Sequence, residues 1–438
     1  MLSNIKNYKF DHNYLIKIFF NIFPLIMLLP SAYITMHSVA FIIYSYIFFF
    51  IKKINIKYFF IDYLIFIFFI LAIISTIIGY GNSDYIIIAK SFADIRFALL
   101  FLIIRNLFHY KIIKINTLLT ISLLCTIFLS IDIFLQFSSG KDILGYPEIN
   151  GRYGGVFGDE AIAGSYIQKF SILAILAALY FKFKKFINKE LFIIFIITTL
   201  GIGILLTLDR IPFFIYIISL FTLLIFVKFF KKVFFFSIIL VLVIFFLFYK
   251  NNDTIKNRYH QIFVFAEIIF FKSTSLETHQ HINKNEMSLK EKTMHTGIEY
   301  FFLFDSAFYT FKNNPWLGSG RKSYHTSCIE MRKFRSDLLC APHTHNIYLE
   351  ILINQGIIGV LVFLTFLITV LKKYYSELVA PRVNNANKIL NISLLILFFF
   401  EIMPLRSYGY IFQTVNGTFF WFLIALISSK LFINKDIK

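Results

Sequence analysis

Residues 314–360 read NPWLGSGRKSYHTSCIEMRKFRSDLLCAPHTHNIYLEILINQGIIGV. This stretch joins a long polar loop to an apolar run of helical length. Pro315 and Gly318 predict the end of a preceding helix, because neither residue continues a helix well. His343 and His345 lie at the junction, and two glycines follow within the apolar run. We therefore expect a histidine-bearing loop held at the end of a membrane helix, with the rest of the chain as its scaffold.

The composition of the chain defines its class. Hydrophobic residues make up 58% of the 438 residues and charged residues only 15%, and long apolar runs recur from end to end. Such a chain is a polytopic membrane protein. We predict an all-α fold with about twelve spans of some 20 apolar residues each. These spans lie near 13–30, 32–51, 58–79, 92–110, 117–137, 161–181, 191–208, 210–229, 233–249, 346–371, 389–405 and 418–433.

The spans divide the chain into three regions. Residues 1–249 hold the first nine spans, residues 250–345 form one large loop, and residues 346–438 hold the last three spans. The first span follows a lysine-containing leader with no clear small-residue cleavage site, so we expect it to be retained.

The net charge of +19 lies mostly in alternate, lysine-rich loops. The opposite short loops and their edges hold only six cations: Lys90, Arg96, Lys141, Arg152, Arg210 and Arg406. By the positive-inside rule, both termini are cytoplasmic and the loop of residues 250–345 faces outward. The basic charge therefore indicates contact with membrane lipid and argues against nucleic acid as a partner.

The cytoplasmic loops carry no recognisable catalytic motif. The nearest approach to a phosphate-binding loop in the whole chain is Gly318-Ser-Gly-Arg-Lys-Ser, which lies in the outward loop and lacks both the glycine before the lysine and the usual spacing. We therefore do not expect an ATP-driven reaction on that side, and a substrate must reach the outward side already activated.

The glycine-rich loop of residues 138–160 is the first polar feature on the outward side. It contains Arg152 and ends on Asp159 and Glu160. One interpretation is a solvated turn with acidic residues at a helix N-terminus. The other is that Arg152 binds an anionic head group while Asp159 or Glu160 orients a sugar hydroxyl.

Asp209 and Arg210 interrupt an almost continuous hydrophobic sequence, LLTLDRIPFF. Ionisable residues at membrane depth are costly and mostly functional. They could simply pair with each other at an interfacial turn, with Pro212 in the first turn of the next helix. We favour a functional role, because a guanidinium group binds phosphate oxygens in a bidentate manner.

Seven of the ten histidines and two cysteines fall in the outward loop. We predict a disulfide between Cys328 and Cys340, because an outward loop lies in an oxidising compartment in a Gram-negative cell; two free thiols are the alternative. Two His-x-His pairs raise the question of zinc, but the cysteine spacing is unlike a zinc finger and no His-Glu-x-x-His helix occurs. We predict no metal site and favour a neutral histidine as general base.

These residues carry a family resemblance. The segment 314–320, NPWLGSG, is followed by His345-Asn346, nine residues, and then Gly356-Ile-Ile-Gly359. This resembles the signature of the O-antigen ligase and O-antigen polymerase superfamily. The ligase pattern ends with Gly, Thr or Tyr where this chain has valine. Arg210 matches an arginine that the family carries at the start of an outward-facing helix, although the family more often has Ser or Gly before it. Residues 155–167 are similar to polymerase-like members.

The resemblance implies a metal-independent membrane glycosyltransferase without a cofactor. Such enzymes move a glycan from undecaprenyl diphosphate to an acceptor sugar hydroxyl at the periplasmic face of the bacterial inner membrane. The catalytic residues would be His345, as general base, and Arg210, which would stabilise the leaving diphosphate. Substrate-binding roles fall to the following residues: Arg152, Asp159, His343, Asn346 and Glu350. We expect Arg210 and His345 to meet at one outward-facing cavity.

Several alternatives stay open. A ligase uses a lipid A core as acceptor and a polymerase uses another lipid-linked repeat unit, and residues 155–167 favour the second whereas the motif at His345 favours the first. Asn346 could also cap the helix that follows. Glu350 either bonds to the histidines or lines a cavity. A transporter of lipid-linked glycans is a more distant possibility, because the polar groups cluster at one face rather than at mid-bilayer.

Overall fold

The computed structural model describes residues 11–81, 83–149, 151–180, 188–227, 230–260, 299–378, 385–404, 406 and 411–429. Within these ranges the secondary structure is helical, apart from two isolated bridges in the loop of residues 138–160. The middle of the predicted outward loop, residues 261–298 with His279, His281 and His295, lies outside the described residues.

The helices follow one another along the chain in this order: α1 (His12–Asn21), α2 (Phe23–Ile26), α3 (Ser31–Ile51), α4 (Phe60–Tyr80), α5 (Tyr85–Ala93), α6 (Ile95–His109), α7 (Asn116–Ser139), the 3₁₀ turn η1 (Gly155–Phe157), α8 (Ala163–Tyr180), α9 (Lys189–Leu206), α10 (Arg210–Phe226), α11 (Lys231–Asn251), α14 (Glu299–Phe311), α15 (Tyr324–Met331), α16 (Ile347–Leu378), α17 (Asn385–Ile402) and α18 (Thr414–Ser428).

The all-helical prediction is confirmed for the described residues, but the count of twelve spans is not. Seven of the described helices are long and apolar enough to cross a membrane, namely α3, α4, α7, α8, α9, α11 and residues 347–372 of α16. Helices α10 and α18 are apolar but have only 17 and 15 residues. The predicted span 92–110 is interrupted at Asp94, which leaves α6 with 15 residues. About 20 residues are needed to cross the hydrocarbon core, so these elements fall short on their own.

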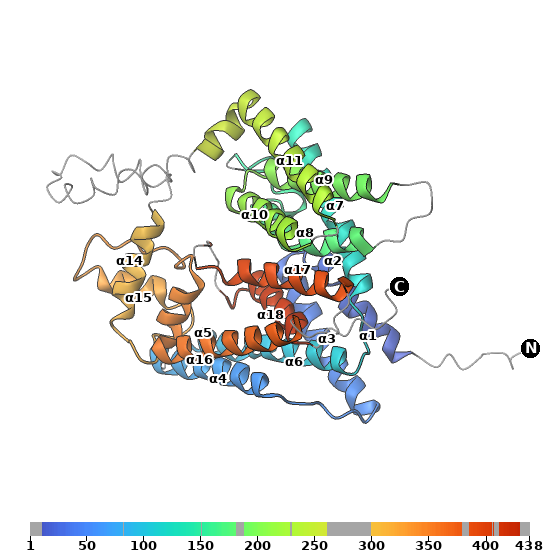
Figure 1. The fold of residues 1–438 in the computed structure, drawn as a ribbon. Helices are drawn as coiled ribbons and strands as arrows, with labels where there is room; N and C mark the ends of the chain where they lie inside the picture. The colour runs from blue at the N-terminus through green and yellow to red at the C-terminus, as the bar shows by residue number, and fades with distance from the viewer. Residues whose placement is uncertain are drawn as a thin grey trace, which may run out of the picture.

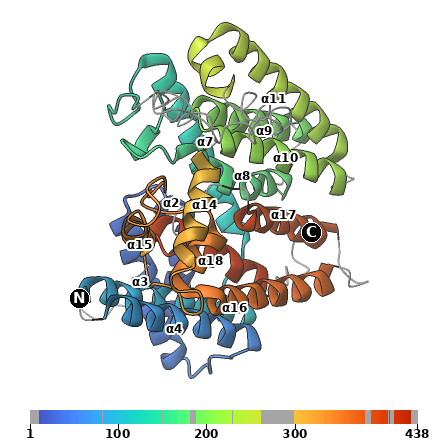
Figure 2. The ribbon, with the colours of Figure 1, turned by 90° about the vertical axis from the view of Figure 1, so that its left-hand side faces the viewer.

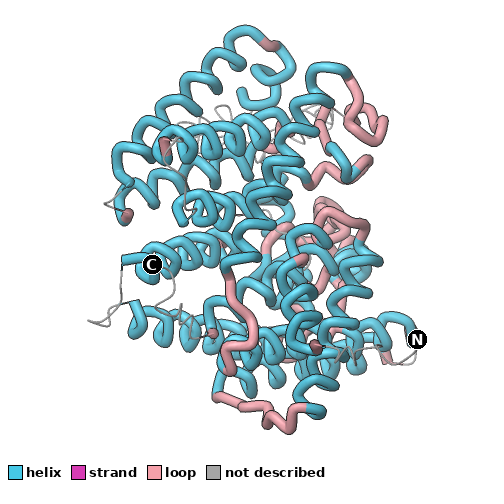
Figure 3. Tube along the Cα trace, turned by 90° about the vertical axis from the view of Figure 1, so that its right-hand side faces the viewer, coloured by secondary structure: helices cyan, strands magenta, loops and turns pink. Residues whose placement is uncertain are grey.

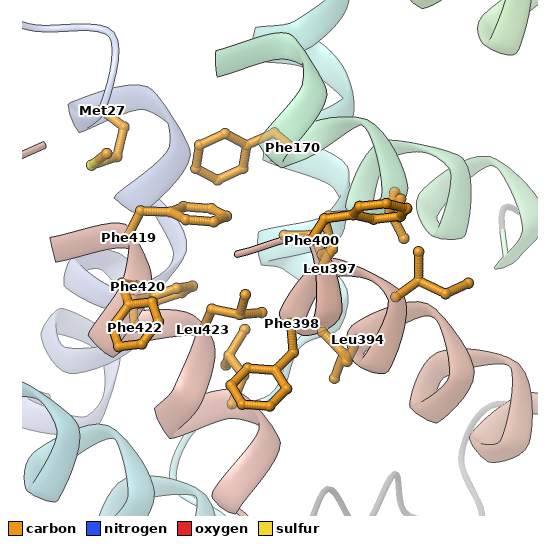
Figure 4. Packing of buried hydrophobic residues seen from close by; sticks show 14 of the residues in the cluster. Met27, Phe170, Leu394, Leu397, Phe398, Phe400, Phe419, Phe420, Phe422 and Leu423 are labelled. Atoms are coloured by element: carbon orange, nitrogen blue, oxygen red, sulfur yellow. The ribbon is translucent and has the colours of Figure 1, made fainter. Parts of the chain in front are cut away.

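Helices α8 and α18 form the centre of the bundle. All residues of α18 from Gly417 to Ser428 are buried, and so are nearly all residues of α8. Because neighbouring helices cover them on every side, these two helices lie in the interior of the bundle and not at a lipid-facing surface. Figure 4 shows how Phe170 of α8 lies near Phe419 of α18 and how Leu397 of α17 completes the cluster. The aromatic packing of this core fixes the helix ends that carry the polar residues described below.

The arrangement of the helices gives the bundle two distinct ends. Helices α14 and α15 lie together at one end, and α1 lies at the other (Figure 1). Viewed from the first end, α14 and α15 lie towards the viewer, with α7 to α11 above them and α4 and α16 below (Figure 2). The opposite side of the molecule again shows helices joined by loops (Figure 3).

Helix α16 is not the continuous span that the sequence predicted, because it breaks at Gly356 (φ 66°, ψ −166°). The segment 314–320 fills this break. Two of its amides donate to the carbonyls of residues 353–354 at 2.8 and 3.0 Å, and two of its carbonyls accept from the amides of residues 357–358 at 2.9 and 3.3 Å. The backbone groups that the break leaves without helical partners are thereby satisfied, as buried backbone groups must be. The motif glycine is therefore a docking point for the loop and not a face for packing helices.

Replacing Gly356 by alanine should destabilise the protein more than replacing Gly140. Both glycines have positive φ, but a Cβ at Gly140 meets nothing within 4 Å, whereas a Cβ at Gly356 falls 2.1 Å from the Trp316 carbonyl oxygen. Strained backbone alone costs about 1–3 kcal/mol, and the overlap adds to it. Thermal unfolding of both variants in detergent measures the difference, and equal midpoints for the two would contradict this account of the break.

Candidate functional site

The start of α10 forms one wall of a cavity of about 200 Å³ that is rich in arginine. Its polar lining consists of Arg152, Ser165, Asp209, Arg210, Arg258 and Arg406. The arginines come from four separate parts of the chain, so the tertiary fold assembles them. Four guanidinium groups share this lining with a single carboxylate, which favours an anion as the ligand.

Arg210 takes up a position that local helix stability does not favour, and Asp209 before it does not cap the helix with its side chain. Asp209 is the N-cap of α10, but its side chain makes no capping hydrogen bond. Its carboxylate instead lies 3.6 Å from Arg152 Nη1. Arg210 is the first residue of the helix, where a cation opposes the helix dipole. Leu208, just before them, has a positive φ of 61°. Strain of this kind concentrates at functional sites.

Helix α8 approaches the same carboxylate closely. The Gly164 backbone amide bonds to Asp209, and a Cβ at Gly164 would fall 2.9 Å from Asp209 Oδ2. Burial raises the pKa of Asp209 to about 6 despite the neighbouring arginines. Burial, with Arg152 and Arg210 nearby, lowers the pKa of Arg258. The cavity thus combines concentrated positive charge with restricted access of water.

Arg406 reaches the cavity from the segment that follows α17. Its side chain is held by the Phe400 carbonyl at 3.0 Å, by an ion pair with Glu401 at 2.5 Å and by Gln168 of α8 at 3.3 Å. Arg406 is only 7% exposed. These partners fix the direction of the guanidinium group before any ligand binds.

The two junction histidines lie side by side just before α16. The ring centroids of His343 and His345 are 4.0 Å apart and their planes are tilted by 48°. Between them, the Thr344 backbone amide and hydroxyl lie 3.2 and 3.0 Å from Glu350 Oε2. Glu350 is buried and also accepts from Asn354 at 3.4 Å. Glu350 therefore braces the backbone between the histidines through Thr344.

The backbone and the surroundings of His345 are both unusual. Its φ is 55°, a conformation that residues other than glycine rarely adopt. Burial and the neighbouring His343 lower the pKa of His345 to about 4. Burial and then the Lys322 ammonium group lower the pKa of His343. Both imidazoles are therefore neutral at pH 7, which is the form that can accept a proton.

The structure places Asn346 as the cap of α16. Its Oδ1 accepts from the amides of Tyr348 and Leu349 at 2.9 and 3.1 Å. Its Nδ2 donates to the Pro404 carbonyl at 2.6 Å, and the Tyr348 hydroxyl donates to the Ile402 carbonyl at 2.6 Å. Both ends of the Asn346 amide are thus engaged within the fold.

These bonds connect the histidines to the arginine cavity. Pro404, which Asn346 contacts, is two residues from Arg406 in the cavity wall. His345 itself is not among the residues that line the cavity in the part of the chain that the structure describes. The segment after α17 therefore joins the two groups, and the expectation that Arg210 and His345 meet at one cavity stays a prediction.

A disulfide braces the loop that leads to the histidines. Cys328 of α15 and Cys340 are bonded, with their Cα atoms 5.5 Å apart. The Tyr324 hydroxyl donates to the Leu339 carbonyl at 2.8 Å in the same region. Tyr324, Cys328 and Leu338 belong to a small buried cluster, separate from the main core. This cluster anchors α15 over the start of α16.

The structure also places the remaining residues of the sequence-based site. Arg152 lines the arginine cavity, whereas Asp159 is exposed and its neighbour Glu160 lines a second cavity. Two lining residues, Arg258 and Arg406, did not come from the sequence reasoning. Arg406 had a signal, since it is one of the few cations on the outward edges. Among the residues that the structure describes, no group of three or more His, Cys, Asp and Glu side chains could hold a metal ion.

A comparison with known proteins identifies one family that this chain resembles. A family model described as O-antigen ligase matches residues 193–364. The matched region runs from α9 into α16 and includes Arg210, Arg258 and the histidine junction. A search of curated proteins finds no match. Together with the signature around His345, the family match supports a relationship of this multi-pass membrane protein to the O-antigen ligase and polymerase superfamily.

Proposed function

We propose that the protein transfers a glycan from undecaprenyl diphosphate to a sugar hydroxyl of a lipid A core, as an O-antigen ligase does. The observation that carries this proposal is the cavity in which four guanidinium groups face one carboxylate at the start of α10. In this account the loop of residues 250–345 and the site face the periplasm, and both termini are cytoplasmic.

The arginine cavity would hold the diphosphate of the donor. Guanidinium groups bind phosphate oxygens in pairs and stay charged when water is excluded. The N-terminal end of α10 adds its partial positive charge. Arg210 and Arg152 would stabilise the negative charge that builds up on the diphosphate as the sugar leaves, and such stabilisation is commonly the largest catalytic contribution. Arg406 and Arg258 would hold the same group in place.

His345 would act as the general base. As the acceptor oxygen bonds to the anomeric carbon, the bond from that carbon to the diphosphate breaks, and undecaprenyl diphosphate leaves with the electron pair. The acceptor proton passes to an imidazole nitrogen of His345. A single displacement of this kind inverts the anomeric carbon. Cleavage of the sugar–diphosphate bond drives the reaction, so the proposal assigns no step to a cofactor.

An apolar groove beside the arginine cavity supports the proposal that the donor carries a long polyprenyl chain. It lies between α10 and α17, has a volume of about 530 Å³, and is lined by residues that include Ile218, Thr222, Phe226, Ile392, Leu395 and Phe399. On α10, Ile215 lines the arginine cavity and Ile218 lines the groove. Residues three apart share one helix face, so the groove continues the line of the cavity along α10. A lipid diphosphate can therefore place its head in the cavity and its tail in the groove.

A larger side chain in the groove should weaken the binding of long-chain donors only. We expect Leu395→Trp to raise KM for the undecaprenyl donor by about threefold to tenfold, and the effect is modest because the displaced tail regains contact with lipid. A donor with a tail of two isoprene units should be unaffected. Leu240→Trp on the exposed face of α11 is the matched control. Equal changes for both donors would remove the groove from the account.

The acceptor can be tested by deleting the gene in its own host and examining surface glycans on a gel. A ligase predicts loss of all glycan chains attached to lipid A core, with restoration by the wild-type gene and not by His345→Asn. Attachment of single repeat units in the deletion strain would instead indicate a polymerase, which residues 155–167 favour. Unchanged surface glycans would contradict both.

A further inference from the structure

A second cavity of about 200 Å³ adjoins the arginine cavity. The two share Ser165 and Arg406 as lining residues. The second cavity is lined in addition by residues that include Phe157, Glu160, Tyr166, Lys169 and Asn416. It lies between the first turns of α8, the start of α18 and the loop before α8.

The chemistry of this second cavity differs from that of the first. Three aromatic rings form an apolar wall, with centroids 5.8 Å apart for Phe157 and Tyr166 and 4.7 Å apart for Tyr166 and Phe170. Phe170 packs onto Phe419 of α18, and this contact holds the wall in place (Figure 4). The polar lining combines hydrogen-bond acceptors, donors and two side-chain amides that do both. Apolar ring faces together with a few polar groups are what a neutral, many-hydroxyl ring requires.

Lys169 is a buried cation in the wall of this second cavity. It lies in the buried helix α8 and is only 4% exposed. Its ammonium group donates to Asn416 Oδ1 at 2.8 Å and lies 5.0 Å from the centroid of the Phe419 ring. Placing a cation in the interior of a membrane bundle is costly and marks function by default. Lys169 fixes the direction of the Asn416 amide at the cavity wall.

We propose that this second cavity binds the sugar ring that is bonded directly to the diphosphate of the donor. The inference rests on the proposed function, because it needs the diphosphate to occupy the arginine cavity. Arg406 lines both cavities and would lie beside the sugar–phosphate bond. The volume is below that of pockets for drug-sized ligands, so the cavity takes one ring and not an oligosaccharide. Glu160 accepts a hydrogen bond from one sugar hydroxyl, and Lys169 and Asn416 form hydrogen bonds with the other hydroxyls.

Two binding probes separate this subsite from the diphosphate site. One is undecaprenyl diphosphate carrying a glycan, and the other is undecaprenyl diphosphate without sugar. The purified full-length protein is titrated with each. We expect Lys169→Met and Glu160→Gln each to weaken binding of the glycan-bearing lipid by about tenfold, the size of one lost hydrogen bond to a charged group. Binding of the sugar-free lipid should not change. Glu160 is exposed, so Glu160→Gln also guards against a folding defect at Lys169.

Arg210→Ala is the matched comparison, because it should weaken both probes alike. If Glu160→Gln and Lys169→Met leave both affinities unchanged, or weaken both equally, the second cavity does not bind the sugar. If the wild-type protein binds neither lipid, the proposed function fails and the subsite with it. If it binds both lipids with equal affinity, the assignment of the diphosphate site is kept and the proposed sugar subsite is wrong.

Discussion

Replacing Arg210 by alanine is expected to lower kcat/KM for glycan transfer by about 10²–10³-fold, the usual effect of removing one group that stabilises charge in a transition state. Arg210 lines the cavity with three other arginines, so the loss reflects its place at the leaving diphosphate rather than total charge. Arg210→Lys should recover only part of the activity, because lysine keeps the charge but not the paired hydrogen bonds. Initial transfer rates of the purified variants give the measurement.

Folding should not account for this loss. A cation at the first position of a helix opposes the helix dipole, so alanine there does not weaken α10. Arg335→Ala is the control, because Arg335 pairs with Asp305 at the surface and is not among the residues described as lining the cavity. If Arg210→Ala transferred the glycan at the wild-type rate, the assignment of the diphosphate to this cavity would be wrong.

Replacing His345 by asparagine should reduce kcat by about 10²–10⁴-fold, the range that a general base contributes. Asparagine is chosen because it tolerates the positive φ of 55° at this position better than alanine does. An amide cannot take up the acceptor proton, so the loss falls on the chemical step and donor binding is kept. Single-turnover transfer together with a binding titration separates these two effects.

The exposed His325 provides the control for His345→Asn. His325→Ala removes an imidazole from the same loop, where Nδ1 lies 3.1 Å from the Cys340 carbonyl oxygen. It should leave transfer unchanged. Full activity of His345→Asn, or a loss of donor binding equal to the loss of rate, would contradict the role of general base.

The dependence of kcat/KM on pH tests the same residue independently. A base must be unprotonated to act, and the pKa of His345 is lowered to about 4 by burial and by His343. Activity that depends on His345 is therefore complete above pH 5 and is lost as the pH falls through about 4. A midpoint near 6.5, the ordinary value for an imidazole, would mean that a different and more exposed group is the base.

Local sequence pattern accounted for much of the fold. Apolar runs marked where the helices lie, and Asn346 was recognisable as a possible helix cap because capping depends on a few adjacent residues. The break at Gly356 was not predictable in this way. It exists because the segment 314–320, about 40 residues earlier in the chain, supplies the backbone hydrogen bonds that the helix gives up. Spacing alone therefore suggested an unbroken helix.

The site was only partly predictable for the same reason. Arg152 and Arg210 stood out because each charge interrupts or borders an apolar sequence. Arg258 gave no such signal, since it lies in a polar stretch of sequence and reaches the cavity only through tertiary packing. The choice of Asp159 over Glu160 depended on the turn after Gly158, whose φ of 62° the sequence does not specify. Of these two neighbouring acids, Glu160 is among the residues that line the second cavity.

The most direct test of the account is transfer by the purified protein from a defined glycan-bearing undecaprenyl diphosphate to a defined lipid A core, with both products analysed. We predict one undecaprenyl diphosphate released for each glycan transferred, and an inverted anomeric configuration in the product. Arg210→Ala and His345→Asn should both be deficient in the same assay. Retention of configuration, release of undecaprenyl monophosphate, or donor binding without any transfer by the wild-type protein would contradict it.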